Sequence, residues 1–106
     1  LYDIVKFEIS SCDTFTLEGN FGCDTKQNTI YKAYNKLYKL FKNVGEYFKS
    51  HKVIVEKYIP EFAGLGGGSS NCATFMIMVN KVCKLGLPKD ELSKIGATIG
   101  ADVPFF

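Results

Sequence analysis

Arginine and tryptophan are absent from the chain, and histidine occurs only once, as His51. The four cysteines form no C-x-x-C pair and the histidine has no companion ligands, so the sequence predicts no metal centre of the zinc type. No run of about 18 apolar residues is present, which argues against a membrane-spanning helix. No signal-peptide pattern opens the chain. A net charge of +2 is too small to indicate a nucleic-acid partner.

The cysteines leave two disulfides open by count alone. Cys72 and Cys83 lie eleven residues apart on one expected helix, which places them too far apart along its axis to bond to each other. We therefore expect reduced, buried cysteines, as in an intracellular protein.

Hydrophobic residues make up 46% of the 106 residues, enough for the core of one domain. The chain begins at Leu1 within an expected strand and stops at Phe106 after an apolar run. We expect residues 1–106 to be part of one domain, truncated at both ends.

Hydrophobic periodicity predicts an α+β unit. Alternating residues predict strands over 3–10 and 14–18, and a helical period predicts a helix over 28–44 with Asn28 as its N-cap. A third strand is predicted over 52–58, with one side formed by Val53, Val55 and Lys57.

A second helix is expected after a Gly-rich loop, with Ser69, Ser70 and Asn71 as candidate N-caps and Gly86 at its end. It should run to about Leu85, and its inner side should consist of Ala73, Met76, Ile77, Asn80 and Cys83. A short last helix should open near Pro88, with an apolar side formed by Leu92, Ile95 and Ile99.

Four of the ten glycines fall between Gly64 and Gly68, directly before the second helix. Glycine can adopt positive φ and has no Cβ to keep a ligand away from backbone N–H groups. The helix adds unpaired N–H groups and the positive end of its dipole, and the hydroxyl of Ser69 or Ser70 can bond a phosphate oxygen or Mg²⁺. A flexible linker is the alternative, but a linker is not flanked by a strand and a capped apolar helix. The sequence therefore predicts a polyphosphate site.

Two common phosphate motifs are absent from this loop. A P-loop requires Lys before its Ser or Thr, whereas Gly68 precedes Ser69. A dinucleotide fingerprint requires glycine at position 69.

The stretch Pro60-x-x-Ala63-Gly64-Leu65-Gly66-Gly67-Gly68-Ser69-Ser70-Asn71 resembles the ATP-binding motif of the GHMP kinase superfamily. The segment 100–106, Gly-Ala-Asp-Val-Pro-Phe-Phe, is similar to the second active-site stretch of that family. The resemblance spans nearly the whole chain. It implies the α+β N-terminal domain of that fold, which resembles a ribosomal-protein domain and contains a left-handed β-α-β crossover that no sequence pattern would predict.

The triple-glycine form of the motif is most similar to the branch of the family that belongs to the non-mevalonate isoprenoid pathway. That branch implies ATP-dependent phosphorylation of the 2-hydroxyl of 4-diphosphocytidyl-2-C-methyl-D-erythritol, with ATP and Mg²⁺ as cofactors. It also implies a small-molecule partner, and it leaves the oligomeric state open. The location would be the cytoplasm in a bacterium and the plastid in a plastid-bearing eukaryote.

The resemblance assigns the catalytic base to Asp102, which would take the proton of the substrate hydroxyl. Without it, Asp102 would be read as a turn or cap residue, Lys57 as a strand-edge charge and Asn28 as a helix cap. The nucleotide contacts that the resemblance implies are Pro60, Ala63, Gly64, Leu65, Gly66, Gly67, Gly68, Ser69, Ser70, Lys57 and Asn28.

Two residues depart from the family pattern: Phe62 stands where glycine is usual, and Cys72 where alanine is usual. Other parts of the family's site lie before Leu1 and beyond Phe106, so we expect the chain alone not to turn over substrate.

Three alternatives remain open from the sequence. One is another kinase of the family, of the homoserine, mevalonate or galactose type, whose loops usually lack three successive glycines. The second is an RNA-binding domain of the same fold, which predicts a basic sheet bearing aromatic residues and no phosphate loop. The third is a nucleotide-binding sensor without catalysis.

Overall fold

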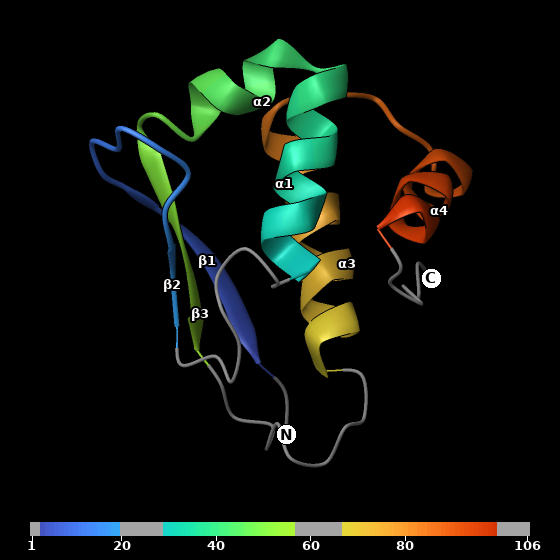
Figure 1. Ribbon diagram of the computed structural model, residues 1–106, viewed down its shortest axis with the longest axis horizontal. Helices are drawn as coiled ribbons and strands as arrows, with labels where there is room; N and C mark the ends of the chain where they lie inside the picture. The colour runs from blue at the N-terminus through green and yellow to red at the C-terminus, as the bar shows by residue number, and fades with distance from the viewer. Residues whose placement is uncertain (1–2, 20–28, 57–66, 100–106) are drawn as a thin grey trace.

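The computed structural model describes residues 3–19, 29–56 and 67–99. Strands β1 (Ile4–Ile9), β2 (Leu17–Glu18) and β3 (His51–Glu56) form one sheet in the order β1-β3-β2. The described helices are α1 (Thr29–Leu40), α2 (Lys42–Tyr47), α3 (Gly67–Val82) and α4 (Lys89–Thr98). They lie on one side of the sheet, as Figure 1 shows. The α+β prediction is therefore confirmed.

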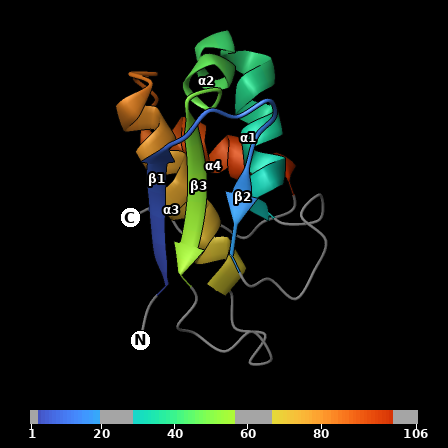
Figure 2. The ribbon, with the colours of Figure 1, turned by 90° about the vertical axis from the view of Figure 1, so that its left-hand side faces the viewer.

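The connection from β2 to β3 has an unusual hand. β3 pairs parallel with β2 and antiparallel with β1. The parallel pair is connected through α1 and α2, of which α1 lies behind the sheet in Figure 2 and α2 above its upper end. In that view both parallel strands run downward, β2 lies to the right of β3, and the chain passes behind the sheet through α1, so the path between them is left-handed. About 98% of such crossovers are right-handed, so the hand itself distinguishes this fold from most βαβ units.

The inner face of β3 carries the core of the sheet. Val53 and Val55 are buried, as their alternation predicts, and their neighbours on β1 are Phe7 and Val5. The ring of Phe48 lies 5.2 Å from that of Phe7 in an edge-to-face arrangement. Burying one such side chain contributes about 1.5–3 kcal/mol. The residues of the core cluster are Ile30, Ala33, Leu37, Val44, Phe48, Val53, Val55, Cys72, Phe75, Met76, Val79, Leu92 and Ile95.

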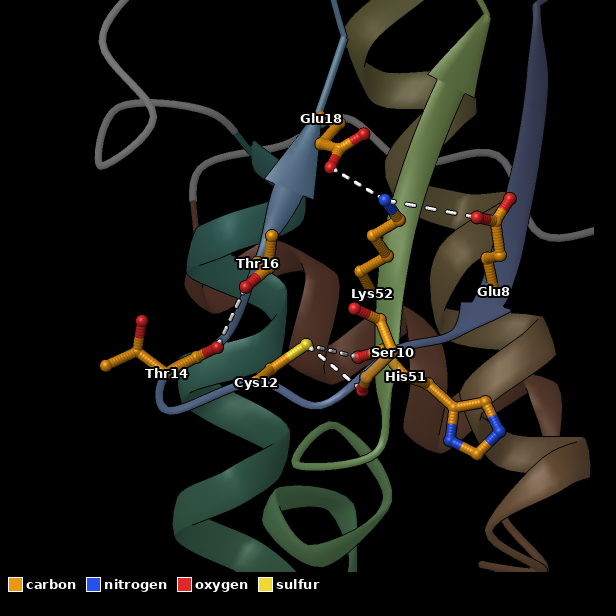
Figure 3. A network of polar contacts seen from close by, with 8 residues as sticks. All are labelled: Glu8, Ser10, Cys12, Thr14, Thr16, Glu18, His51 and Lys52. Atoms are coloured by element: carbon orange, nitrogen blue, oxygen red, sulfur yellow. Dashed lines mark hydrogen bonds and ion pairs between the residues drawn. The ribbon is translucent and has the colours of Figure 1, made fainter.

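The outer face of the sheet is charged and balanced (Figure 3). The Nζ atom of Lys52 lies 3.0 Å from Oε1 of Glu18 and 3.9 Å from Oε1 of Glu8. Lys6 pairs with Glu56 on the same face. These pairs join all three strands across the side that the helices leave uncovered.

The single helix expected over 28–44 is wrong, because Phe41 interrupts it. Phe41 has extended backbone angles, φ −138° and ψ 107°, and separates α1 from α2. The change of direction lets Val44 and Phe48 reach the core, where both are fully buried. Periodicity alone placed Phe41 and Val44 on the same apolar side as the earlier residues of one helix.

The strand expected over 14–18 is also shorter than predicted, since only Leu17 and Glu18 pair with β3. Phe15 instead stacks on Tyr34 of α1, with ring centroids 4.1 Å apart. Side-chain packing on a helix has replaced backbone pairing there.

The inner side of α3 differs from the prediction at three positions. Ala73 and Met76 are buried as expected, but Ile77 is 45% exposed, and Phe75 and Val79 are buried instead. In the last helix, α4, Leu92 and Ile95 are buried as predicted, and Ile99 packs against the core.

The left-handed residue that terminates α3 is Lys84 and not the predicted Gly86. The helix ends at Val82, and Lys84 adopts the left-handed conformation with φ 54°. The N–H of Leu85 then donates to the carbonyl of Asn80 over 3.0 Å, the hydrogen bond of a Schellman motif. Gly86, with φ 68°, lies in the turn that follows.

The side chain of Asn80 holds the connection from α3 to α4. Its Nδ2 donates to the carbonyl of Leu87 over 2.8 Å, and its Oδ1 accepts from the N–H of Leu87 over 2.9 Å. One amide thereby satisfies both backbone groups of a half-buried residue.

We predict that Asn80→Asp lowers the free energy of unfolding by about 1–3 kcal/mol, because the carboxylate loses the donor and faces the carbonyl of Leu87. Urea unfolding of the full-length protein measures this, with Lys81→Ala, at the exposed neighbouring position, as the control. Equal unfolding midpoints in the two variants would show that the paired bonds contribute nothing.

Candidate functional site

The ends of four elements gather at one end of the molecule. The carboxyl ends of β2 and β3 and the amino ends of α1 and α3 all lie toward the lower end in Figure 1. Ligands of α/β proteins bind outside the carboxyl ends of strands, where helix amino ends add donors. This end of the fold is therefore the candidate site.

The Gly-rich segment supplies the first turn of α3. The helix begins at Gly67, so Gly68, Ser69 and Ser70 lie inside it. The expectation that Ser69, Ser70 or Asn71 caps the helix is wrong, because the helical backbone starts two residues earlier than Ser69. The N–H groups of the first turn, including those of Gly67, Gly68 and Ser69, have no acceptor within a helix.

The two helix ends at this site carry no acidic residue in their first turns, in α1 or in α3. The positive end of each dipole is therefore not neutralised by a carboxylate of its own first turn. Such an end attracts an anion, and the 16 residues of α3 make it a long helix.

Asn71 connects the start of α3 to the start of β1. It is 6% exposed, and its Nδ2 donates to Oδ2 of Asp3 over 2.9 Å. The sequence motif contains this asparagine, but its partner lies 68 residues away. No local signal could have paired the two.

Cys72, the next residue, lies against the start of α1. Its thiol is fully buried and contacts the carbonyl oxygen of Thr29 at 3.7 Å and Sδ of Met76 at 3.9 Å. Burial raises the pKa of the Cys72 thiol from 9.0 to about 11, against a lowering by the contact with Thr29. The thiol is therefore protonated near neutral pH and is not a nucleophile there.

Most of the predicted site residues lie outside the described ranges. Gly67, Gly68, Ser69 and Ser70 are placed together in the first turn of α3. The structure does not describe Asn28, Lys57, Pro60, Phe62, Ala63, Gly64, Leu65, Gly66 or Asp102. Asn28 and Lys57 are sequence neighbours of Thr29 and Glu56, which begin α1 and end β3.

In residues 3–19, 29–56 and 67–99, no group of three or more His, Cys, Asp or Glu side chains could hold a metal ion. Cys12, Cys72 and Cys83 are free thiols, while Cys23 lies outside these ranges. No helix in the described part is long and apolar enough to span a membrane.

The family model for the N-terminal domain of GHMP kinases matches residues 28–106, which include both the glycine segment and Asp102. The chain belongs to the GHMP kinase family.

Curated relatives match the chain over its whole length. It is 51% identical over 106 residues to a 4-diphosphocytidyl-2-C-methyl-D-erythritol kinase of Sulfurovum sp. and covers 42% of that protein. It is 48% identical to the protein of the same name from Sulfurimonas denitrificans, of which it also covers 42%. It is 41% identical to one from Acinetobacter baumannii, covering 37% of it. The chain thus spans about two fifths of the length of these relatives.

The buried thiol predicts a pH dependence of stability. Because the pKa of Cys72 is raised in the folded state, the folded protein keeps its proton between about pH 9 and 11 while the unfolded chain loses it. The free energy of unfolding therefore falls as pH rises through this window, by up to about 2–3 kcal/mol.

We predict that Cys72→Ala flattens this fall in unfolding free energy between pH 9 and 11, measured by urea unfolding at each pH. Tyr34 and Tyr47, whose pKa values burial also raises, contribute equally in both proteins. Parallel pH profiles for wild type and Cys72→Ala would contradict the assignment of the slope to Cys72.

Proposed function

We propose that the protein carrying this chain is an ATP-dependent kinase that phosphorylates the 2-hydroxyl of 4-diphosphocytidyl-2-C-methyl-D-erythritol. The observation that carries the proposal is the 51% identity, over all 106 residues, to a relative bearing the name of that kinase. The arrangement of the start of α3 supports it, since two glycines open a 16-residue helix without an acidic first turn.

In this proposal the first turn of α3 holds the phosphate chain of ATP through backbone N–H groups. Gly67 and Gly68 have no side chains to block the approach of phosphate oxygens. Pro60, Ala63, Gly64, Leu65 and Gly66 continue the same cradle in sequence, and Lys57 and Asn28 contact the adenosine part.

Asp102 is the proposed catalytic base. It accepts the proton of the substrate hydroxyl while that oxygen forms a bond to the γ-phosphorus, and the bond from this phosphorus to the bridging oxygen of ADP breaks. Mg²⁺, when bound, supplies positive charge that neutralises phosphate oxygens, and the hydroxyl of Ser69 or Ser70 is its proposed contact.

The outer face of the sheet argues against the RNA-binding alternative. That reading predicts a basic face bearing aromatic rings. In the described strands, however, Lys6 and Lys52 of this face are matched by Glu8, Glu18 and Glu56, and Phe7 points instead into the core, where its ring meets that of Phe48.

The relatives named above come from bacteria, and we propose a cytoplasmic location and a small-molecule partner on the same basis.

We predict that the full-length protein transfers phosphate from ATP to 4-diphosphocytidyl-2-C-methyl-D-erythritol in preference to homoserine, mevalonate or galactose. Asp102→Asn should lower kcat by about 10²–10⁴-fold and leave the Kd for ATP within about twofold. Asp90→Asn, at an exposed position in the first turn of α4, is the matched control and should be unaffected.

Each contrary outcome has a distinct meaning. Preference for another acceptor would overturn the proposed substrate. ATP binding without transfer to any acceptor would favour the sensor reading, and equal turnover by Asp102→Asn would remove that residue from its role.

A further inference from the structure

The start of α3 is anchored to two other elements by consecutive residues. Asn71 bonds to Asp3, directly before β1, and Cys72 contacts the carbonyl of Thr29, at the start of α1. The two contacts tie the first turns of α3 to the segments that surround the candidate site.

The two contacts differ in strength. The Asn71 bond has a length of 2.9 Å and joins an amide donor to a carboxylate, and hydrogen bonds to charged groups are stronger than neutral ones. The thiol contact of Cys72 is weaker, with a distance of 3.7 Å to its carbonyl acceptor. The bond to Asp3 is therefore the main side-chain restraint on this end of α3 among the contacts given above.

The position of Asn71 makes that restraint relevant to ligand binding. It is the fifth residue of a helix that starts at Gly67, so it lies one turn beyond the N–H groups that have no helical acceptor. A rotation or slide of the helix at Asn71 would move those N–H groups by a similar amount, and a displacement of about 1 Å is enough to weaken a preorganised site.

We propose that Asp3 and Asn71 are a positioning pair, which holds the first turn of α3 in register with β1 so that its N–H groups meet the phosphate chain of the nucleotide. Neither residue touches the phosphates. This proposal rests on the proposed function, since it assigns a phosphate ligand to the start of α3.

Two variants of Asp3 separate the hydrogen bond from the charge. Asp3→Asn keeps an oxygen that can accept from Nδ2 of Asn71, whereas Asp3→Ala removes the acceptor. Asp3 is half-buried and lies outside the strand, so both variants are expected to fold.

A matched control exists at the opposite end of the same helix. Asn43 of α2 is exposed and donates from Nδ2 to the carbonyl of Cys83 over 2.9 Å. Asn43→Ala therefore removes a bond of the same length from the other end of α3, and it should leave nucleotide binding unchanged.

The experiment measures the Kd for ATP by calorimetry, the KM for ATP, kcat and the thermal midpoint in the full-length protein. We expect Asp3→Ala and Asn71→Ala to raise Kd and KM for ATP about tenfold, with kcat within about threefold, because displaced N–H groups would lose about one hydrogen bond's worth of contact with the charged phosphates. Asp3→Asn should stay within about threefold of wild type in all constants.

The exchange variant Asp3→Asn with Asn71→Asp provides the rescue. Asn71→Asp alone places two carboxylates together and should weaken ATP binding, whereas the double variant restores one amide and one carboxylate and should regain most of the affinity.

The outcomes distinguish the two proposals. If the wild type does not bind ATP, the proposed function fails. If the wild type binds ATP but Asp3→Ala matches Asn43→Ala, the positioning pair is refuted, as it is if Asp3→Asn loses as much affinity as Asp3→Ala. A loss of thermal stability without a change in KM would likewise assign the pair a structural role only.

Discussion

Burial of one face of the sheet beneath α1 and α3 is the constraint on which the rest of the structure depends. Val53 and Val55 of the central strand are apolar on that side, and Phe48 and Phe75 fill the space between sheet and helices with rings 5.7 Å apart. Because both helices run back along the parallel strands β2 and β3, their amino ends come to the same end of the molecule (Figures 1 and 2). Packing alone therefore brings the positive ends of two helix dipoles to the same end of the molecule.

The other face of the sheet is charged rather than apolar. With no helix over it in the described structure, it carries alternating charges, and Lys52 joins strands β1 and β2 through Glu8 and Glu18 (Figure 3). Exposed pairs of this kind contribute about 0–1 kcal/mol each, so they keep this face of the sheet hydrophilic and add little to the stability of the fold. The sheet therefore depends on its inner face for stability.

Local sequence patterns predicted the elements well where each depends on its own residues. The alternation around Val53 and the apolar side of α4 at Leu92 and Ile95 were correct, because burial on one face imposes a period. The patterns failed where a distant contact decides the backbone. Phe41 breaks the first helix so that Val44 and Phe48 can reach the core, and nothing at Phe41 itself marks a break.

The candidate site also combines features that local sequence can predict with features that depend on distant contacts. A helix after the glycines could be predicted, because missing side chains and unpaired N–H groups are local properties, but its start at Gly67 lies two residues before the predicted caps. The bond from Asn71 to Asp3 could not, since its register is set by the packing of α3 against β1. The left-handed crossover came only from the family resemblance, because sterics favour the other hand.

The proposed function depends on binding of the nucleotide's phosphate chain by the first turn of α3. Titration of the isotope-labelled full-length protein with a non-hydrolysable ATP analogue, followed by amide resonances in two-dimensional NMR, tests it most directly. We expect the N–H resonances of Gly67, Gly68 and Ser69 to be among the most strongly shifted, with saturation at the same concentration as the calorimetric binding. Saturable binding that leaves these three resonances unmoved would contradict it.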